Sequence, residues 1–195
     1  MRVRELELGG VWNIGGYENV RLCVRVAADG REAGDVLAEL MQLVRDLAEV
    51  SVAVRQAYRA RERLLDMWKR SLEEAESKSR RLETRREEYR EESRRRLEKI
   101  NLALLPEDVR RQITEEPLKA FCLGVLDPSC VNLRELDWLK QEADQARREA
   151  EEYQRKAEEV KSLVDGIIEE LRQGALPKNQ VRRLRELVKP YQNGW

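Results

Sequence analysis

The basic side chains of this chain are the groups whose type and spacing suggest a chemical role. That role would be the binding of phosphate groups. Residues 178–189 hold five cations against one acid: Lys178, Arg182, Arg183, Arg185 and Lys189. Such a cluster can follow the phosphate backbone of a nucleic acid. Residues 78–99 hold ten basic and six acidic residues. For both segments the alternative is a solvated helix face with ion pairs between residues four apart, and we favour it most for residues 78–99.

Residues 9–18 contain four glycines and are predicted to form a long hairpin loop. This loop would bring two aromatic residues near two arginines. If exposed, Trp12 and Tyr17 could stack on nucleic-acid bases beside Arg21 and Arg25. The alternative is that both rings close over a small core. The stretch has no Gly-Lys-Ser/Thr sequence and is therefore not a P-loop.

Catalytic and metal-binding constellations are missing from the sequence. It contains no histidine, which excludes Ser-His-Asp and Cys-His catalysis and imidazole ligands for zinc. Its three cysteines form no CxxC pair. Cys122 and Cys130 either form a disulfide that closes a short loop or remain free, buried thiols, and we favour the second alternative. We expect no enzymatic activity, no cofactor and no metal site.

Residues 106–130 are far more apolar than the segments on either side. Exposed apolar clusters mark binding surfaces, so we assign five residues here to the docking of a partner protein: Val109, Ile113, Leu118, Phe121 and Leu123. The alternative is that they pack only against one another, in a small core that closes the end of a helical hairpin.

Long helices are the elements that must position these groups. One helix carries an unbroken heptad pattern, and such a narrow apolar stripe must pack against another helix. The pattern consists of Leu136, Leu139, Ala143, Ala146, Ala150, Tyr153, Ala157, Val160, Val164, Ile167 and Leu171. The chain has no Gly or Pro between Val36 and Leu105, which predicts a second long helix that ends at Pro106.

The short segment between these helices favours an antiparallel pairing. In the register that we predict, Ala75 lies opposite Val160 and Leu97 lies opposite Leu139. The last helix would run back along residues 36–57, with Leu184 near Val52. There it would cover a second apolar flank, formed by Leu37, Met41, Val44 and Val52.

Residues 2–8 and 19–27 are predicted strands, because the second alternates apolar and polar residues. The sequence Trp12-Asn13-Ile14-Gly15-Gly16-Tyr17-Glu18-Asn19-Val20-Arg21 resembles the opening hairpin of small uncharacterised phage and mobile-element proteins. That resemblance implies no particular activity. The helical plan is similar to that of coiled-coil chaperones such as prefoldin, which place their hairpins between the helices rather than before them.

The predicted fold is mainly α: a long antiparallel coiled-coil helical hairpin on a small base with an N-terminal two-stranded β-hairpin. Its parts are a base of hairpin and first helical turns (1–60), a first arm (61–105), an apolar helical tip (106–130), a second arm (131–174) and a basic C-terminal helix packed on the base (175–195).

We predict a non-enzymatic scaffold that forms a homo-oligomer, most simply a dimer, through its base and docks an unidentified protein with its tip. The alternative is a nucleic-acid-associated accessory protein of a virus or mobile element. No apolar run predicts a signal peptide or a membrane span, so we expect a cytoplasmic location, in the host if the protein is viral. The 39% of charged residues is typical of thermophiles.

Overall fold

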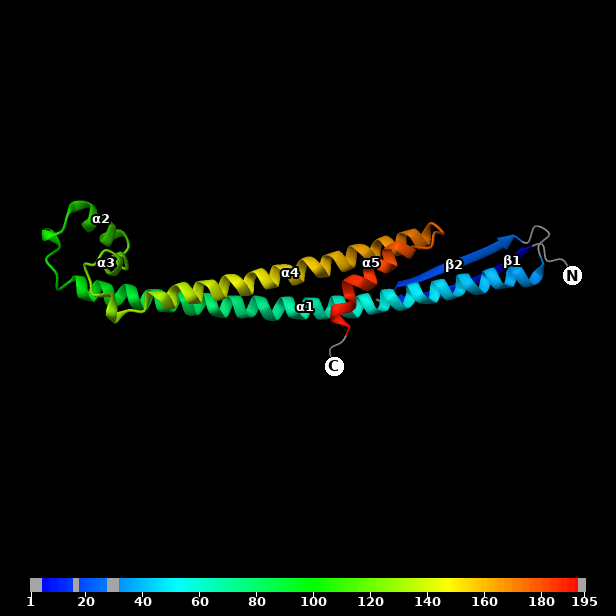
Figure 1. The fold of residues 1–195 in the computed structure, drawn as a ribbon, viewed down its shortest axis with the longest axis horizontal. Helices are drawn as coiled ribbons and strands as arrows, with labels where there is room; N and C mark the ends of the chain where they lie inside the picture. Colours follow the sequence, from blue (N-terminus) through cyan, green and yellow to red (C-terminus); the bar gives the residue numbers. More distant parts are fainter. Residues whose placement is uncertain (1–4, 16–17, 28–31, 193–195) are drawn as a thin grey trace. The chain divides into compact units, whose positions relative to one another are not determined.

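The computed structural model describes residues 5–15, 18–27 and 32–192. Most of this part of the chain is helical (Figure 1), so the predicted mainly α fold class is confirmed. In chain order, the elements are β1 (Glu5–Gly15), β2 (Glu18–Ala27), α1 (Ala33–Leu97), η1 (Leu102–Leu104), α2 (Glu107–Glu115), α3 (Lys119–Cys122), η2 (Pro128–Cys130), α4 (Leu133–Arg172), α5 (Lys178–Val188) and η3 (Lys189–Tyr191).

β1 and β2 pair antiparallel, with Trp12 opposite Val20, and the register shifts between Asn13 and Gly15. β1 contains most of the stretch over residues 9–18 that we expected to be a loop. Glycine keeps both of its backbone hydrogen-bonding groups, so a strand ladder can run through it.

The chain forms two compact units, which we describe separately. Unit 1 comprises residues 1–68 and 152–195, and unit 2 comprises residues 69–151. The long helices α1 and α4 each contribute one part to unit 1 and another to unit 2.

Unit 1 has a core made by three helices. Buried apolar side chains of α1, α4 and α5 pack into one cluster, which includes Val54, Leu64, Val164, Ile167 and Leu184. α4 ends because Gly174 adopts a φ of 79°, a left-handed conformation that closes the helix with a bond from Ala175 N to the Glu170 carbonyl. The chain then reverses into α5.

α5 crosses α1 at an angle and points in the same direction (Figure 1), whereas we predicted the opposite direction. Lys178, at the start of α5, lies 2.8 Å from Asp46. Gln192, just beyond its end, donates a hydrogen bond to Gln56 over 3.2 Å. Contact positions therefore increase together along both helices. The predicted approach of Leu184 to Val52 assumed an antiparallel helix and is replaced by this arrangement.

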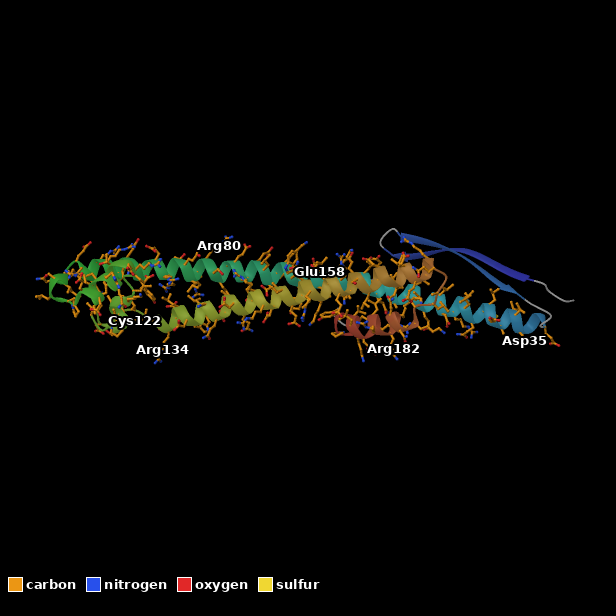
Figure 2. The ribbon with its side chains drawn as sticks, turned by 90° about the horizontal axis from the view of Figure 1, so that it is seen from above. Asp35, Arg80, Cys122, Arg134, Glu158 and Arg182 are labelled. Carbon is orange, nitrogen blue, oxygen red and sulfur yellow. The ribbon has the colours of Figure 1, made fainter. Side chains whose placement is uncertain are left out.

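In unit 2, α1 and α4 lie side by side and antiparallel (Figures 1 and 2). Lys78 Nζ lies 3.5 Å from Glu142 Oε2, and Arg85 Nε lies 3.4 Å from Glu135 Oε1. The predicted register places residue 158 opposite Lys78, so it is wrong by about two heptads. A slip by whole heptads keeps the same residues in the seam, which is why periodicity alone does not reveal it.

The apolar stripe predicted for α4 is confirmed as its buried face. Nine of the eleven heptad residues are buried, and Leu136 and Tyr153 are half-buried. The helix begins directly after Asn132, whose Oδ1 accepts a hydrogen bond from Glu135 N over 3.3 Å. That bond satisfies one of the free N–H groups of the first helical turn.

Candidate functional site

The apolar segment of unit 2 folds into a core with the last turns of α1. α1 ends at Leu97 and not at Leu105, and Asn101 Oδ1 accepts from Ala103 N over 3.2 Å at the start of η1. This early stop lets Leu97 pack into one cluster with Ile113 and Phe121. An uninterrupted helix could not turn those apolar residues toward each other.

This burial corrects the predicted docking surface. Ile113, Leu118 and Phe121 are only 2%, 8% and 3% exposed. Val109 is half-buried against the same cluster. Leu123 remains 43% exposed. Apolar side chains that can reach each other lower their free energy by excluding water, so most of the predicted surface is the interior of the tip.

Two polar contacts attach the tip to α1 within unit 2. Arg90 Nε and Nη2 donate to the two carboxylate oxygens of Glu116 over 3.0 and 2.9 Å. This bidentate pair lowers the pKa of Glu116 below its ordinary value of 4.5. The fully buried Ser93 donates its hydroxyl to the Pro117 carbonyl over 2.5 Å. Together these bonds fix the chain between α2 and α3 against the long helix.

Most of the cations of residues 78–99 form ion pairs with neighbouring acidic residues. Lys78, Arg80, Arg95 and Arg96 each pair with a glutamate four residues earlier. Arg85, Arg90 and Arg94 also pair with glutamates of the same helix. The interpretation of this segment as an ion-paired helix face is therefore confirmed.

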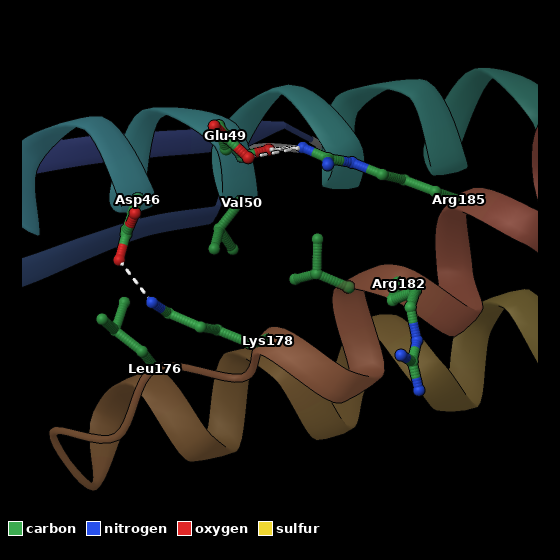
Figure 3. Close-up of a pocket in the computed structure, with 8 residues that line it drawn as sticks. Asp46, Glu49, Val50, Leu176, Lys178, Arg182 and Arg185 are labelled. Atoms are coloured by element: carbon green, nitrogen blue, oxygen red, sulfur yellow. Dashed lines mark hydrogen bonds and ion pairs between the residues drawn. The ribbon is translucent and has the colours of Figure 1, made fainter.

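The cations of residues 178–189 divide into two groups, and Figure 3 shows three of them, Lys178, Arg182 and Arg185. Lys178 pairs with Asp46, and Arg185 Nη2 lies 3.2 Å from Glu49 Oε2. The hydrogen bond between Lys178 and Asp46 lowers the pKa of Asp46 and raises that of Lys178. Arg182, Arg183 and Lys189 are exposed, and no ion pair joins them to the described part of the chain. The apolar side of α5 holds Val181, Leu184 and Val188 in the core of unit 1.

Two pockets lie between α1 and the α5–η3 segment of unit 1, and we call the surface that holds them the α1–α5 groove. The first pocket, of about 280 Å³, is lined by the two ion pairs and by Val50, Leu176, Val181 and Arg182 (Figure 3). The second, of about 150 Å³, is lined by Gln56, Arg59, Ala60, Arg63, Tyr191 and Gln192.

Arg63 closes the far end of this groove. Its Nη1 donates to the carbonyl oxygens of Tyr191 and Gln192 over 2.5 and 3.2 Å. Lys156 Nζ lies 5.9 Å from the centre of the Tyr191 ring, so a cation already covers one face of that ring. The α1 arginines add to the charge of α5, a combination that sequence reasoning missed because it treated α5 alone.

An apolar stripe on α1 is exposed in unit 1. The α1 stripe consists of Leu37, Met41, Val44, Ala48 and Val52. Leu37, Met41 and Val52 are 51%, 51% and 49% exposed. We expected α5 to cover this flank, but its ion pairs hold it against the side of α1 that carries Asp46 and Glu49.

The remaining predicted residues add no further site. Trp12 lies in β1, Arg21 and Arg25 lie in β2, and Tyr17 lies outside the described residues. Their contact with bases stays a prediction. Cys122 carries a free thiol, but it is exposed and not buried as we predicted. Within the described residues, no group of three or more Cys, Asp or Glu side chains is placed to hold a metal ion. No helix in this part of the chain combines the length and apolarity needed to span a bilayer.

Comparison of the chain with protein-family models, with curated proteins and with solved structures finds no match.

Proposed function

We propose that this chain is a non-enzymatic interaction protein that assembles with a second copy of itself through the α1 stripe. The observation that carries the proposal is the exposure of Leu37, Met41 and Val52 on a single helix face. Contiguous apolar surface of this kind lowers its free energy when a partner covers it. Self-association of this kind requires no catalytic groups.

The spacing of the stripe supports a helix as the covering element. Its residues follow one another at intervals of four, three, four and four, close to the heptad pattern of helix pairs. The stripe extends over about 22 Å at the standard helical rise. Ala48, near its middle, lets a second helix approach closely because its side chain is small.

Charges beside the stripe favour an antiparallel pair with a twofold axis near residue 47. Such a pair places Met41 of each copy opposite Val52 of the other. It also brings Arg45 of each copy near Glu49 of the other, on the same edge of the interface. The Glu49 side chain is 65% exposed, so its carboxylate can accept a second cation in addition to Arg185.

The same proposal assigns partner docking to the outer face of the tip. Leu104 and Leu123 support this, because they are 82% and 43% exposed next to a well-packed core. This assignment replaces the buried residues Ile113, Leu118 and Phe121.

Sedimentation equilibrium of a Met41→Asp variant tests the self-association. The charge should shift the protein from dimer toward monomer, since an unpaired carboxylate is costly to bury. Leu104→Asp is the matched control, because it adds the same charge at an exposed leucine of unit 2 and should leave the mass unchanged. A wild-type chain that stays monomeric at about 100 μM, a concentration at which even weak specific pairs form, would refute the proposal.

A further inference from the structure

We propose that the α1–α5 groove of unit 1 binds an acidic amphipathic helix of a partner protein. This inference does not depend on self-association, because no residue of the α1 stripe lines either pocket of the groove. It rests on the charge of the groove, on the spacing of its cations and on the shape of its pockets.

The groove carries an excess of positive charge. Its two pockets are lined by five cations, Arg59, Arg63, Lys178, Arg182 and Arg185, against the two carboxylates of Asp46 and Glu49. A surface with this imbalance attracts and orients ligands of the opposite sign.

The cations of α5 are arranged for a helical ligand. Lys178, Arg182, Arg185 and Lys189 are spaced by four, three and four residues, which places them on one side of α5. Carboxylates at the same spacing on a second helix can face them in register. Because Lys178 and Arg185 already hold Asp46 and Glu49, the ligand's carboxylates would pair with Arg182 and Lys189.

The first pocket supplies an apolar anchor point between the two ion pairs. Val50, Leu176 and Val181 line it, and its volume is about 280 Å³, enough for one leucine or phenylalanine side chain. On α1, the residues that line the two pockets extend from Asp46 to Arg63, about 26 Å at the helical rise and thus about five helical turns. Anchors that repeat every three or four residues are typical of helices bound in grooves.

A nucleic acid is less suited to the same surface. Single strands bind through aromatic rings that stack on bases. Tyr191 is the one aromatic residue among those that line the two pockets, and Lys156 lies over its ring.

Fluorescence anisotropy with the full chain tests the proposal. The probe is a fluorescein-labelled peptide with three repeats of Leu-Glu-Ala-Leu-Glu-Glu-Ala, which combines apolar and acidic faces. A peptide with Gln in place of every Glu keeps the anchors and removes the charge. A single-stranded DNA of about 20 nucleotides, longer than most single binding sites, carries the charge without the anchors. We expect the acidic peptide to bind at least tenfold more tightly than either comparison probe.

A pair of matched variants places the binding in the groove. Arg182→Gln with Lys189→Gln removes two exposed cations, one that lines the first pocket and one at the same side of the helix at the start of η3, and we expect about a tenfold loss of affinity for the acidic peptide. Arg155→Gln with Lys161→Gln removes two exposed cations of α4 and should change the affinity less than twofold. Circular dichroism confirms that both variants remain helical.

Three outcomes would overturn the proposal. One is equal binding of the acidic and the Gln peptides, which includes the absence of any binding. Another is an equal loss of affinity for the acidic peptide in the groove variant and in the α4 variant, which would indicate general charge attraction. The third is tighter binding of the DNA with the same dependence on Arg182 and Lys189, which would make the groove a phosphate-binding surface.

Discussion

Phe121 determines the packing of the tip at the scale of single residues. It is 3% exposed and shares a cluster with Leu97 and Ile113. We expect Phe121→Ala to lower the free energy of unfolding of unit 2 by about 3–5 kcal/mol, because it leaves a large cavity. Leu104→Ala, at an exposed position of the same tip, should cost less than about 0.5 kcal/mol. Urea denaturation measures both, and similar losses would contradict the buried position of Phe121.

Glu116 should make the tip sensitive to acid. Its pair with Arg90 holds the pKa of the folded carboxyl below 4.5, the ordinary value that we take for the unfolded chain. The ionised carboxylate therefore contributes stability above pH 4.5, and this contribution is lost as the pH falls through the folded pKa. Thermal melts of the full chain from pH 7 to pH 3 should show a falling midpoint for unit 2.

Glu116→Gln separates this pair from the other carboxylates. At pH 7 the variant should lose about 1 kcal/mol, a reduced figure because the pair is partly exposed. Below the folded pKa it should approach the wild type, since Glu116 is then neutral in both the folded and the unfolded state. If the difference in melting temperature between the wild type and the variant stays the same down to pH 3, the ionised Glu116 carboxylate is not the cause of that difference.

At the scale of elements, local sequence signals were informative. The heptad residues of α4, the cap at Asn132 and the stop at Gly174 are each encoded within a few residues of where they act. The early end of α1 was not predictable in the same way. It depends on Asn101 together with the apolar residues of the tip, which meet Leu97 only after the chain has turned back.

The register of α1 and α4 was not predictable from periodicity. We expect spin labels at Arg85 and Glu135, in a chain whose native cysteines are replaced by serine, to lie closer than about 25 Å. Moving the second label to Glu149 shifts it by 14 residues, or about 21 Å along the helix, and should lengthen the distance. Double electron–electron resonance measures both pairs. A shorter distance for Arg85 and Glu149 would favour the register derived from the sequence alone.

The direction of α5 explains why the candidate sites were only partly predictable. The sequence showed the cations of α5 and the apolar flank of α1, but not which side of α1 the last helix covers. The pairs of Lys178 with Asp46 and Arg185 with Glu49 decide this, and they join residues more than 130 positions apart. Such pairings leave the α1 stripe open, and they bring Arg59 and Arg63 beside Tyr191 and Gln192, just beyond the end of α5.

For the whole molecule, the direction of the proposed helix pairing can be tested with one double variant. Met41→Asp alone should dissociate the dimer, as should Val52→Lys alone. When both changes are in the same chain, an antiparallel pair places Asp opposite Lys at two symmetric points. We therefore expect sedimentation equilibrium to show that the double variant recovers at least half of the dimer lost in the single variants.

A parallel pairing gives the opposite result. It places the two introduced aspartates together and the two lysines together, so the double variant would dissociate more than either single variant. Circular dichroism of the three variants serves as the control for folding, because all of these positions are exposed on α1 and should leave its helix intact.

Phe121 is the sole phenylalanine of the chain, and it lies in the core of unit 2. Biosynthetic incorporation of fluorophenylalanine would therefore yield a single ¹⁹F resonance, without any need for assignment. Its chemical shift would report on the opening of that core alone, while circular dichroism follows the helices of both units. Any difference between the two melting curves would measure how far the units unfold independently.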